Sequence, residues 1–154
     1  SDSGFCGSMI SRFTQLMLHD TFLEEEQGAD DDDETNSENL KKKAAADLRQ
    51  DHRVRLIAAV SQACLCDALP ASYCYAPLMF LSRKYFGEVS DVSRLFANQL
   101  KAAFPDDMPE RELDALIKMQ EAGDEEGELV KSLATSIAQR YSFAKVGAGI
   151  HHLT

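Results

Sequence analysis

The residues with the greatest chemical potential in this sequence are thiols and imidazoles: Cys64, Cys66, Cys74 and the pair His151-His152. Their sulfur and nitrogen atoms are those that bind zinc in proteins. The spacing argues against zinc, because helix residues two apart point about 200° away from each other, so Cys64 and Cys66 cannot share an ion. We therefore expect no metal and no cofactor, and we expect reduced thiols that pack in the core as small apolar side chains.

A second candidate for ion binding is the acidic segment, residues 24–38, which reads EEEQGADDDDETNSE and holds nine of the chain's 26 carboxylates. A calcium-binding EF-hand loop that began at Asp30 would need Gly at its sixth position and Glu at its twelfth. The chain has Thr35 and Lys41 there, which excludes such a loop. The segment has no large apolar residue to offset the entropy of ordering it, so we expect a disordered acidic linker.

Basic residues follow the acidic segment on a predicted helix, and they form the one candidate site for anions or nucleic acid. No aromatic residue is interleaved for base stacking, and the net charge of −10 with a pI near 4.8 opposes a nucleic-acid partner. The preceding acidic segment is also placed to pair with these cations. The candidate residues are Lys41, Lys42, Lys43, Arg49, Arg53 and Arg55.

No set of residues has the spacing of a catalytic centre. Ser, His and Asp occur without a local frame such as G-x-S-x-G, and His52 is about three turns from the nearest cysteine. We therefore predict no catalytic residues and expect a binding protein rather than an enzyme. A small helical enzyme is the third alternative, after the two binding functions below.

The elements that position these residues are predicted to be helices. Glycine and proline together number only 12, and no stretch alternates apolar and polar residues as a strand would. The fold class is all-α, a helical bundle or short superhelix of about six helices. The first is an amphipathic helix over residues 9–23. The next spans residues 39–69, and its second half, apolar nearly all round, is the predicted core helix with Leu56, Ile57, Val60 and Leu65.

The later helices are bounded by proline and glycine. One begins at Pro77 and ends with Gly87 in the left-handed conformation, and the others span about 90–104, 109–122 and 128–141. Gly123 is the predicted left-handed cap of the third. The predicted inward residues, in chain order, are Leu78, Met79, Leu81, Tyr85 and Phe86; Val92, Leu95, Phe96, Leu100 and Phe104; Leu113, Leu116 and Ile117; and Leu129, Val130, Leu133, Ile137 and Tyr141.

The predicted organisation has five parts. Residues 1–8 are a flexible N-terminus or a cloning remnant, 9–23 the amphipathic helix, 24–38 the acidic linker, 39–143 the helical body and 144–154 a mobile tail. The long charged linker lets the first helix move. That helix either docks in a groove of its own body, exchanges with a second copy to form a dimer, or is replaced by a partner helix.

The predicted function is a protein–protein interaction domain, an adaptor or scaffold that presents a helical surface or groove, as part of a longer protein. Phe13, Leu16, Met17 and Phe22 are the predicted partner-binding residues, at the spacing of helix-in-groove anchors. The alternative is a nucleic-acid-associated regulatory or structural protein that uses the basic helix 41–55, with the acidic segment as an internal competitor. No apolar run reaches the ~18 residues that span a membrane, and the few cysteines favour an intracellular protein, cytoplasmic or nuclear.

Overall fold

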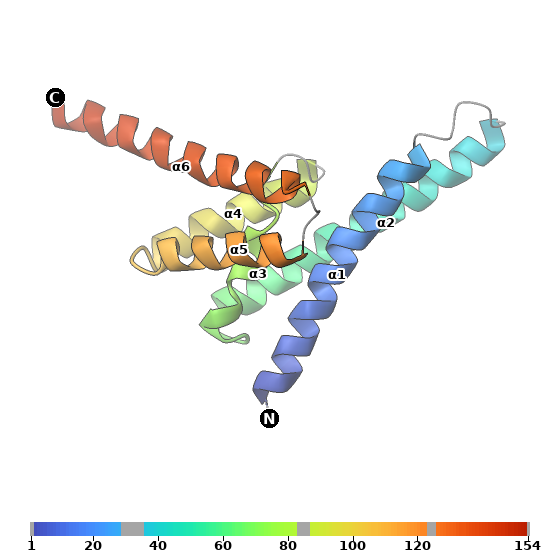
Figure 1. Cartoon of the computed structure of the whole chain (residues 1–154), viewed down its shortest axis with the longest axis horizontal. Coiled ribbons are helices and arrows are strands. Elements are labelled where there is room, and N and C mark those ends of the chain that lie inside the picture. The colour runs from blue at the N-terminus through green and yellow to red at the C-terminus, as the bar shows by residue number, and fades with distance from the viewer. Residues whose placement is uncertain (1, 29–35, 83–86, 123–125, 154) are drawn as a thin grey trace. The chain divides into compact units, whose positions relative to one another are not determined.

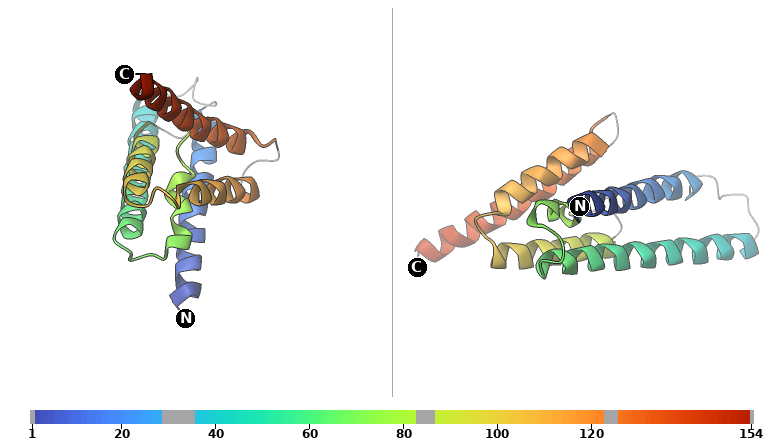
Figure 2. Two further views of the ribbon diagram at one scale, coloured as in Figure 1. Left: turned by 90° about the vertical axis from the view of Figure 1, so that its left-hand side faces the viewer. Right: turned by 90° about the horizontal axis from the view of Figure 1, so that it is seen from below.

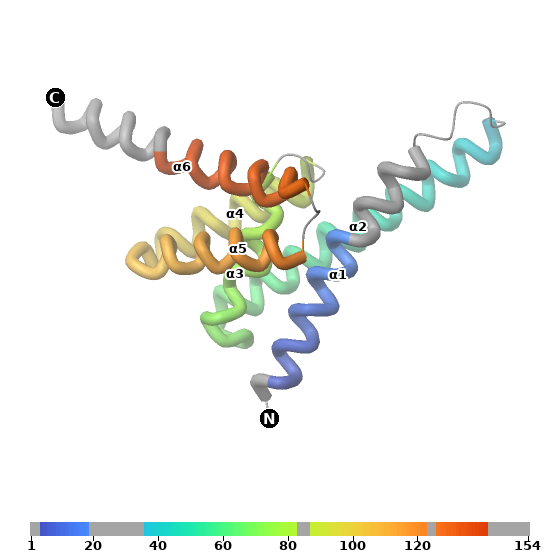
Figure 3. Tube along the Cα trace, viewed as in Figure 1, coloured from blue at the N-terminus to red at the C-terminus, as the bar shows by residue number. Residues whose placement is uncertain are grey.

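The computed structural model describes the backbone of residues 2–28, 36–82, 87–122 and 126–153, and the side chains of residues 4–18, 36–82, 87–122 and 126–141 (coloured in Figure 3). Within these ranges the chain forms six α-helices and one short 3-10 helix but no strand, which confirms the all-α prediction. The elements are α1 (Asp2–Gly28), α2 (Asn36–Leu65), η2 (Ala71–Tyr73), α3 (Tyr75–Leu78), α4 (Gly87–Ala103), α5 (Met108–Ala122) and α6 (Glu128–Leu153) (Figure 1). The chain divides into two compact units, Ser1–Ala76 and Pro77–Thr154.

The first unit is built on α1 and α2, which lie side by side and run in opposite directions (Figures 1 and 2). In α1 the residues Ile10, Phe13 and Met17 are buried, at steps of three and four that place them on one face. The α1 helix begins earlier and ends later than the predicted range 9–23. Residues 29–35 of the predicted acidic linker lie outside the described residues.

The start of α1 also has a structural role that the sequence did not reveal. Gly7 belongs to α1, and a Cβ added there would lie 3.3 Å from the hydroxyl oxygen of Tyr73. The missing side chain therefore lets the Tyr73 ring approach the α1 backbone closely.

The second half of α2 is buried along one stripe rather than all round, so the prediction of an all-round buried helix is wrong. The stripe consists of Arg53, Ile57, Ser61 and Cys64, whereas Ala58 and Ala59 are exposed. Alanine is apolar by composition but has little surface to bury, so a run rich in alanine does not need cover on every side. Leu56, Val60 and Leu65 are half-buried.

The α2 helix ends at Leu65, before the predicted terminator Pro70. Asp67 has a φ of 62°, and aspartate is one of the few non-glycine residues that tolerate this left-handed conformation. The Leu69 amide then donates to the Ala63 carbonyl at 3.1 Å, which closes the turn. The chain therefore leaves the helix through a local reversal before proline is reached.

The second unit departs from prediction at its start. The expected helix over 77–86 is absent from the described part, where α3 makes one turn and Gly87 begins α4. Gly87 does not have positive φ, so the prediction that it caps a helix in the left-handed conformation is wrong. Leu78, Met79 and Leu81 are buried as predicted. Tyr85, Phe86 and the predicted cap Gly123 lie outside the described residues.

The buried face of α4 differs from the predicted apolar stripe. Phe96 and Leu100 are buried as predicted, but Leu95 and Phe104 are exposed and Val92 is half-buried. Small residues complete the face instead, because Ser93 and Ala97 let neighbouring backbone approach. The Ser93 hydroxyl donates to the Pro77 carbonyl at 2.6 Å, which satisfies a buried backbone acceptor next to α3.

The buried face of α5, which contacts α6, also differs from the predicted one. The predicted inward residues Leu113 and Ile117 are exposed, and Leu116 is half-buried, so this prediction is wrong for the first two. The buried face consists of Met108, Glu112, Ala115 and Met119.

In α6 the residues Leu129, Leu133 and Ile137 are buried as predicted, Val130 is half-buried, and Tyr141 is exposed, contrary to prediction. Gly127, with a φ of 72°, precedes the helix, and its carbonyl accepts from the Lys131 amide at 3.1 Å. The α6 helix extends to Leu153, so it includes most of the predicted tail 144–154.

Candidate functional site

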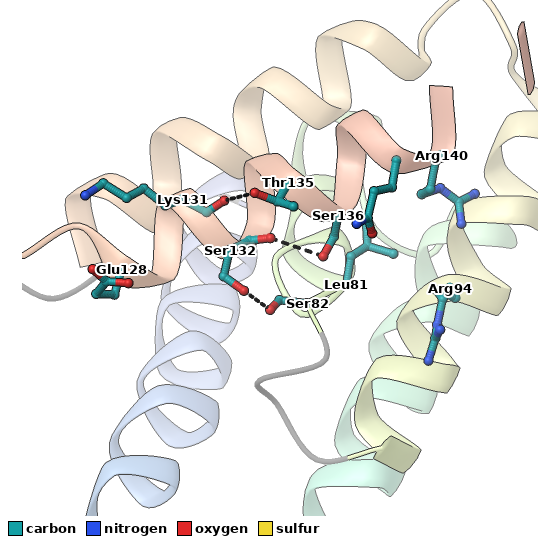
Figure 4. Close-up of a pocket in the computed structure, with 10 residues that line it drawn as sticks. Leu81, Ser82, Arg94, Glu128, Lys131, Ser132, Thr135, Ser136 and Arg140 are labelled. Carbon is teal, nitrogen blue, oxygen red and sulfur yellow. Dashed lines mark hydrogen bonds between the residues drawn. The ribbon is translucent and has the colours of Figure 1, made fainter. Parts of the chain in front are cut away.

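The second unit contains a groove of about 580 Å³. Its wall on α6 is a polar stripe of positions 132, 135, 136, 139 and 140, which recur at helical spacing next to the buried residues Leu133 and Ile137. The segment after α3 and the first turns of α4 complete the lining (Figure 4). The lining residues are Leu81, Ser82, Arg94, Glu128, Lys131, Ser132, Thr135, Ser136, Gln139 and Arg140.

Arg94, on α4, is held in place by its own helix. Its Nη2 atom donates to the Ser90 hydroxyl at 3.0 Å and forms an ion pair with Asp91 at 2.6 Å. Both interactions are made by the same terminal nitrogen, so the N–H groups on Nε and Nη1 are available to a ligand. The Arg94 side chain is one-third exposed, which keeps the guanidinium accessible from the groove.

Arg140, on α6, is held by α4. Its Nη2 atom donates to the Asn98 side-chain oxygen at 2.7 Å. Asn98 follows Arg94 by one helical turn, whereas the Arg94 guanidinium is held by Ser90 and Asp91 in the preceding turn, so the two guanidinium groups are anchored at different levels of α4. Figure 4 shows the two arginines at the same end of the groove, whereas Lys131 and Glu128 are at the other.

Hydroxyl groups line the groove between its charged ends. The Ser82 and Ser132 hydroxyls share a hydrogen bond, and Ser82 is buried (Figure 4). Thr135 donates to the Lys131 carbonyl at 2.9 Å and Ser136 to the Ser132 carbonyl at 3.1 Å. Because these two hydroxyl hydrogens are used within the helix, Thr135 and Ser136 offer a ligand their oxygen lone pairs.

The charge of the groove is opposite in sign to that of the whole chain. Arg94, Lys131 and Arg140 contribute three positive charges and Glu128 one negative charge, in a protein of net charge −10. Asp91 pairs with Arg94, and Arg140 has a neutral partner in Asn98.

The predicted anion-binding residues on α2 are only partly available. Lys41, Lys42, Lys43 and Arg55 are exposed and Arg49 is half-buried. Arg53 is 2% exposed, and its Nη1 atom lies 3.5 Å from the Gln50 side-chain oxygen. Arg53 therefore belongs to the buried stripe of the first unit and is not accessible to a phosphate group.

Two of the predicted partner-binding residues are part of the core of the first unit. Phe13 and Met17 are buried, Leu16 is half-buried, and the side chain of Phe22 lies outside the described residues. The described part of α1 thus shows an apolar face that is already covered.

An uncovered apolar stripe occurs on α5 instead. Leu113 is 56% exposed and Ile117 is 44% exposed, and both point away from the buried face. Glu110 and Glu121 continue the same stripe at its two ends, by steps of three and four residues. The outer face of α5 therefore has an apolar centre with an acidic rim.

A second, smaller hollow of about 100 Å³ lies beside α5 and α6 and is lined by Glu112, Arg140 and Tyr141 among others. Glu112 is only 4% exposed, and its carboxylate accepts a hydrogen bond from the Tyr141 hydroxyl at 2.5 Å. This bond, together with burial, raises the pKa of Tyr141 to about 12. The pair joins α5 to α6 and leaves the phenol neutral at ordinary pH.

The buried thiol of Cys64 is a poor candidate for a reactive nucleophile. None of the four cysteines forms a disulfide; Cys64 and Cys74 are buried, as predicted for core thiols, whereas Cys66 is exposed, contrary to that prediction. The hydrogen bond that the Cys64 thiol shares with Cys74, together with burial, raises the pKa of the Cys64 thiol. A raised pKa keeps sulfur protonated, and a protonated thiol is a poor nucleophile.

Comparison of the chain with protein-family models, with curated proteins and with solved structures finds no match in any of the three. Among the described residues, no helix combines the length and the apolar character that a membrane-spanning segment needs. The same residues contain no group of three or more His, Cys, Asp or Glu side chains placed to hold a metal ion.

Proposed function

We propose that this chain is a protein–protein interaction domain that binds a basic amphipathic helix of a partner through the outer face of α5. The observation that carries the proposal is the exposed pair Leu113 and Ile117, one turn apart on a face with acidic ends. Spacing of this kind suits helix-to-helix contact, in which apolar side chains bind and charged rims select the partner. The net charge of −10 favours approach of a cationic partner.

The proposal is tested with three helical peptides that share one apolar face and carry lysine, glutamate or glutamine on the other. The lysine peptide should bind the full chain most tightly. The double variant Leu113→Asp/Ile117→Asp should weaken binding by roughly tenfold or more, since each residue is an apolar anchor. Added aspartates attract a basic peptide, so a loss of affinity cannot come from charge.

The control is Leu48→Asp, which adds one aspartate, half the charge of the double variant, at another exposed leucine, on α2. Circular dichroism should show all variants folded, because the substituted side chains are exposed. The proposal fails if the glutamate peptide binds as well as the lysine peptide. It fails also if Leu48→Asp weakens binding as much as the double variant does.

The second candidate function is nucleic-acid association through α2. Its support is the exposure of Lys41, Lys42, Lys43 and Arg55 along that helix. Arg53 is buried and cannot contact a phosphate group, which weakens this candidate. Binding of RNA or DNA to the full chain that falls steeply with rising salt, and that the triple variant Lys41→Gln/Lys42→Gln/Lys43→Gln reduces, would make it the leading function.

We infer an intracellular setting for either function, cytoplasmic or nuclear. The support is the pair Cys64 and Cys74, whose thiols are in contact but not joined by a disulfide. Oxidising compartments join such neighbouring thiols, whereas the reducing interior of a cell keeps them apart. Quantifying free thiols in the protein as isolated from its native source tests this, and a Cys64–Cys74 disulfide there would contradict it.

A further inference from the structure

We propose that the partner helix bound by the outer face of α5 is α2 of a second copy of this chain. This inference rests on the function proposed above and names the partner of that same face. Its basis is a match between two helix faces that belong to different units. The outer face of α5 is apolar with acidic ends, and the outer face of α2 is apolar with basic ends.

The outer face of α2 has the apolar stripe that an amphipathic partner helix needs. Leu40 and Leu48 are 67% and 70% exposed, and Ala44, also exposed, lies one turn from each. Steps of four residues place all three on one side of the helix, opposite the buried stripe that contains Ile57 and Cys64. Both leucines are therefore accessible to another molecule.

The charges at the ends of the two apolar stripes are opposite in sign. On α2 the exposed residues Lys41 and Arg55 lie on the same face as the leucines, near its two ends. On α5 the corresponding positions are Glu110 and Glu121. The basic pair is about 21 Å apart along the helix axis and the acidic pair about 17 Å, a difference that long basic side chains cover. Either direction of α2 along α5 therefore brings basic ends to acidic ends.

The two segments as wholes show the same complementarity. Residues 36–55 contain six basic and three acidic residues, whereas α5 contains two basic and four acidic ones. Asp51 lies on the outer face of α2 and Lys118 at the edge of the outer face of α5, so these exceptions are also opposite in sign. Two copies of net charge −10 repel at a distance, but salt screens that repulsion beyond about 8 Å at physiological ionic strength. The local charges of the two faces therefore dominate at contact.

The test is sedimentation equilibrium of the full chain over a concentration series at physiological salt, in which the unmodified chain should self-associate. Leu40→Asp/Leu48→Asp disrupts the α2 face and Leu113→Asp/Ile117→Asp the α5 face. Each variant should associate roughly tenfold more weakly, since each loses two apolar anchors. An equimolar mixture of the two variants should recover association, because the first retains an intact α5 face and the second an intact α2 face.

The matched control is Phe5→Asp/Leu95→Asp, which adds the same two aspartates at exposed apolar residues on α1 and α4, outside both faces. It should associate as the unmodified chain does, and circular dichroism should show every variant folded, because the substituted side chains are exposed. The inference is overturned if the unmodified chain stays monomeric throughout the series, if the control associates as weakly as the face variants, or if the mixture associates no more than either variant alone.

Peptide binding separates a failure of this inference from a failure of the proposed function. A chain that binds the lysine peptide but stays monomeric retains α5 as a binding face and overturns only the choice of a second copy. A chain that neither binds the peptide nor self-associates overturns both. Because α2 of a second copy would compete with the peptide for α5, Leu48→Asp should bind the lysine peptide at least as tightly as the unmodified chain.

Discussion

The chain has two groups of cationic side chains, one on α2 at residues 41–55 and one in the groove of the second unit. The two groups differ in how their side chains are held. The α2 group has more positive charges, but Lys41, Lys43 and Arg55 extend from a helix surface into solvent. The groove has fewer, but Arg94 and Arg140 come from different helices and are each held by a hydrogen bond or ion pair.

The comparison indicates that orientation, rather than the number of charges, separates a candidate site from a charged surface. Flexible exposed side chains lose conformational entropy when they bind, and salt screens their attraction. Arg94 and Arg140 have lost part of that entropy already in the folded protein. Arg53 is a third case. Its side chain is buried in the first unit, so a ligand cannot reach its guanidinium group.

The largest expected effect concerns the stripe that contains Arg53. Ile57, in the same stripe, is 0% exposed, so Ile57→Ala should lower the free energy of unfolding by roughly 2–5 kcal/mol. Val60→Ala should cost less, because Val60 is half-buried. Chemical denaturation measures both, and a change below ~0.5 kcal/mol at Ile57 would show that this face of α2 is not a core.

A contrast between two arginines sharpens the comparison. Arg53→Gln should lower the free energy of unfolding by about 2–3 kcal/mol, because the substitution removes part of a buried side chain that packs in the stripe. Arg94→Gln should change it by less than ~1 kcal/mol, because the ion pair with Asp91 is partly exposed. Equal destabilisation by the two variants in urea would mean that Arg94 is as structural as Arg53.

A smaller effect is expected when the charge of α2 is removed. The triple variant Lys41→Gln/Lys42→Gln/Lys43→Gln should weaken self-association of the chain by less than about fivefold at physiological salt, since exposed ion pairs contribute little and salt screens them. Sedimentation equilibrium at two salt concentrations checks this. A loss as large as that of Leu40→Asp/Leu48→Asp would show that these exposed charges, rather than the leucines, hold the copies together.

The smallest effect concerns Tyr141, next to Arg140. Its bond to Glu112 raises the phenol pKa from the ordinary 10.0 to about 12. The stabilisation from this proton is therefore present below pH 10 and is lost as pH rises from 10 to about 12. Tyr141 is 41% exposed, so the change in stability should be small.

The ionisation of Tyr141 is visible in the difference in phenolate absorbance between the unmodified chain and Tyr141→Phe. That difference should appear near pH 12. A difference centred near pH 10 would mean that the Glu112–Tyr141 bond does not hold in solution.

Much of the secondary structure was predictable from local patterns. Proline positions and apolar periodicity gave the all-α class and the approximate ranges of α2, α4, α5 and α6. The buried faces are less predictable, because apolar periodicity favours placing the large aliphatic side chains inward. In α4 the packing uses Ser93 and Ala97, whose small size allows close approach and leaves Leu95 exposed. In α5 the buried face contains Glu112 and Met119, and Leu113 is exposed.

The groove itself had no local signal in the sequence. Arg140 and Asn98 are 42 positions apart, and only the packing of α4 against α6 brings them together. The hydroxyl stripe of α6 has the composition of an ordinary solvated helix face. The basic stretch on α2 was detectable because its residues are close together in the sequence, yet this proximity did not reveal that Arg53 is buried whereas Lys41 is exposed.

The most direct test of the difference between the two groups of cationic side chains follows the arginine Nε–H signals by nitrogen relaxation NMR. The sample is the full chain with Leu113→Asp/Ile117→Asp, which prevents α2 from docking on a second copy, and assignments come from single Arg→Lys variants. We predict high order parameters for Arg94 and Arg140, whose guanidinium groups are anchored, and a low order parameter for the exposed Arg55. Equal order parameters in the three would contradict this, because the groove would then hold its cationic side chains no more firmly than the surface of α2 does.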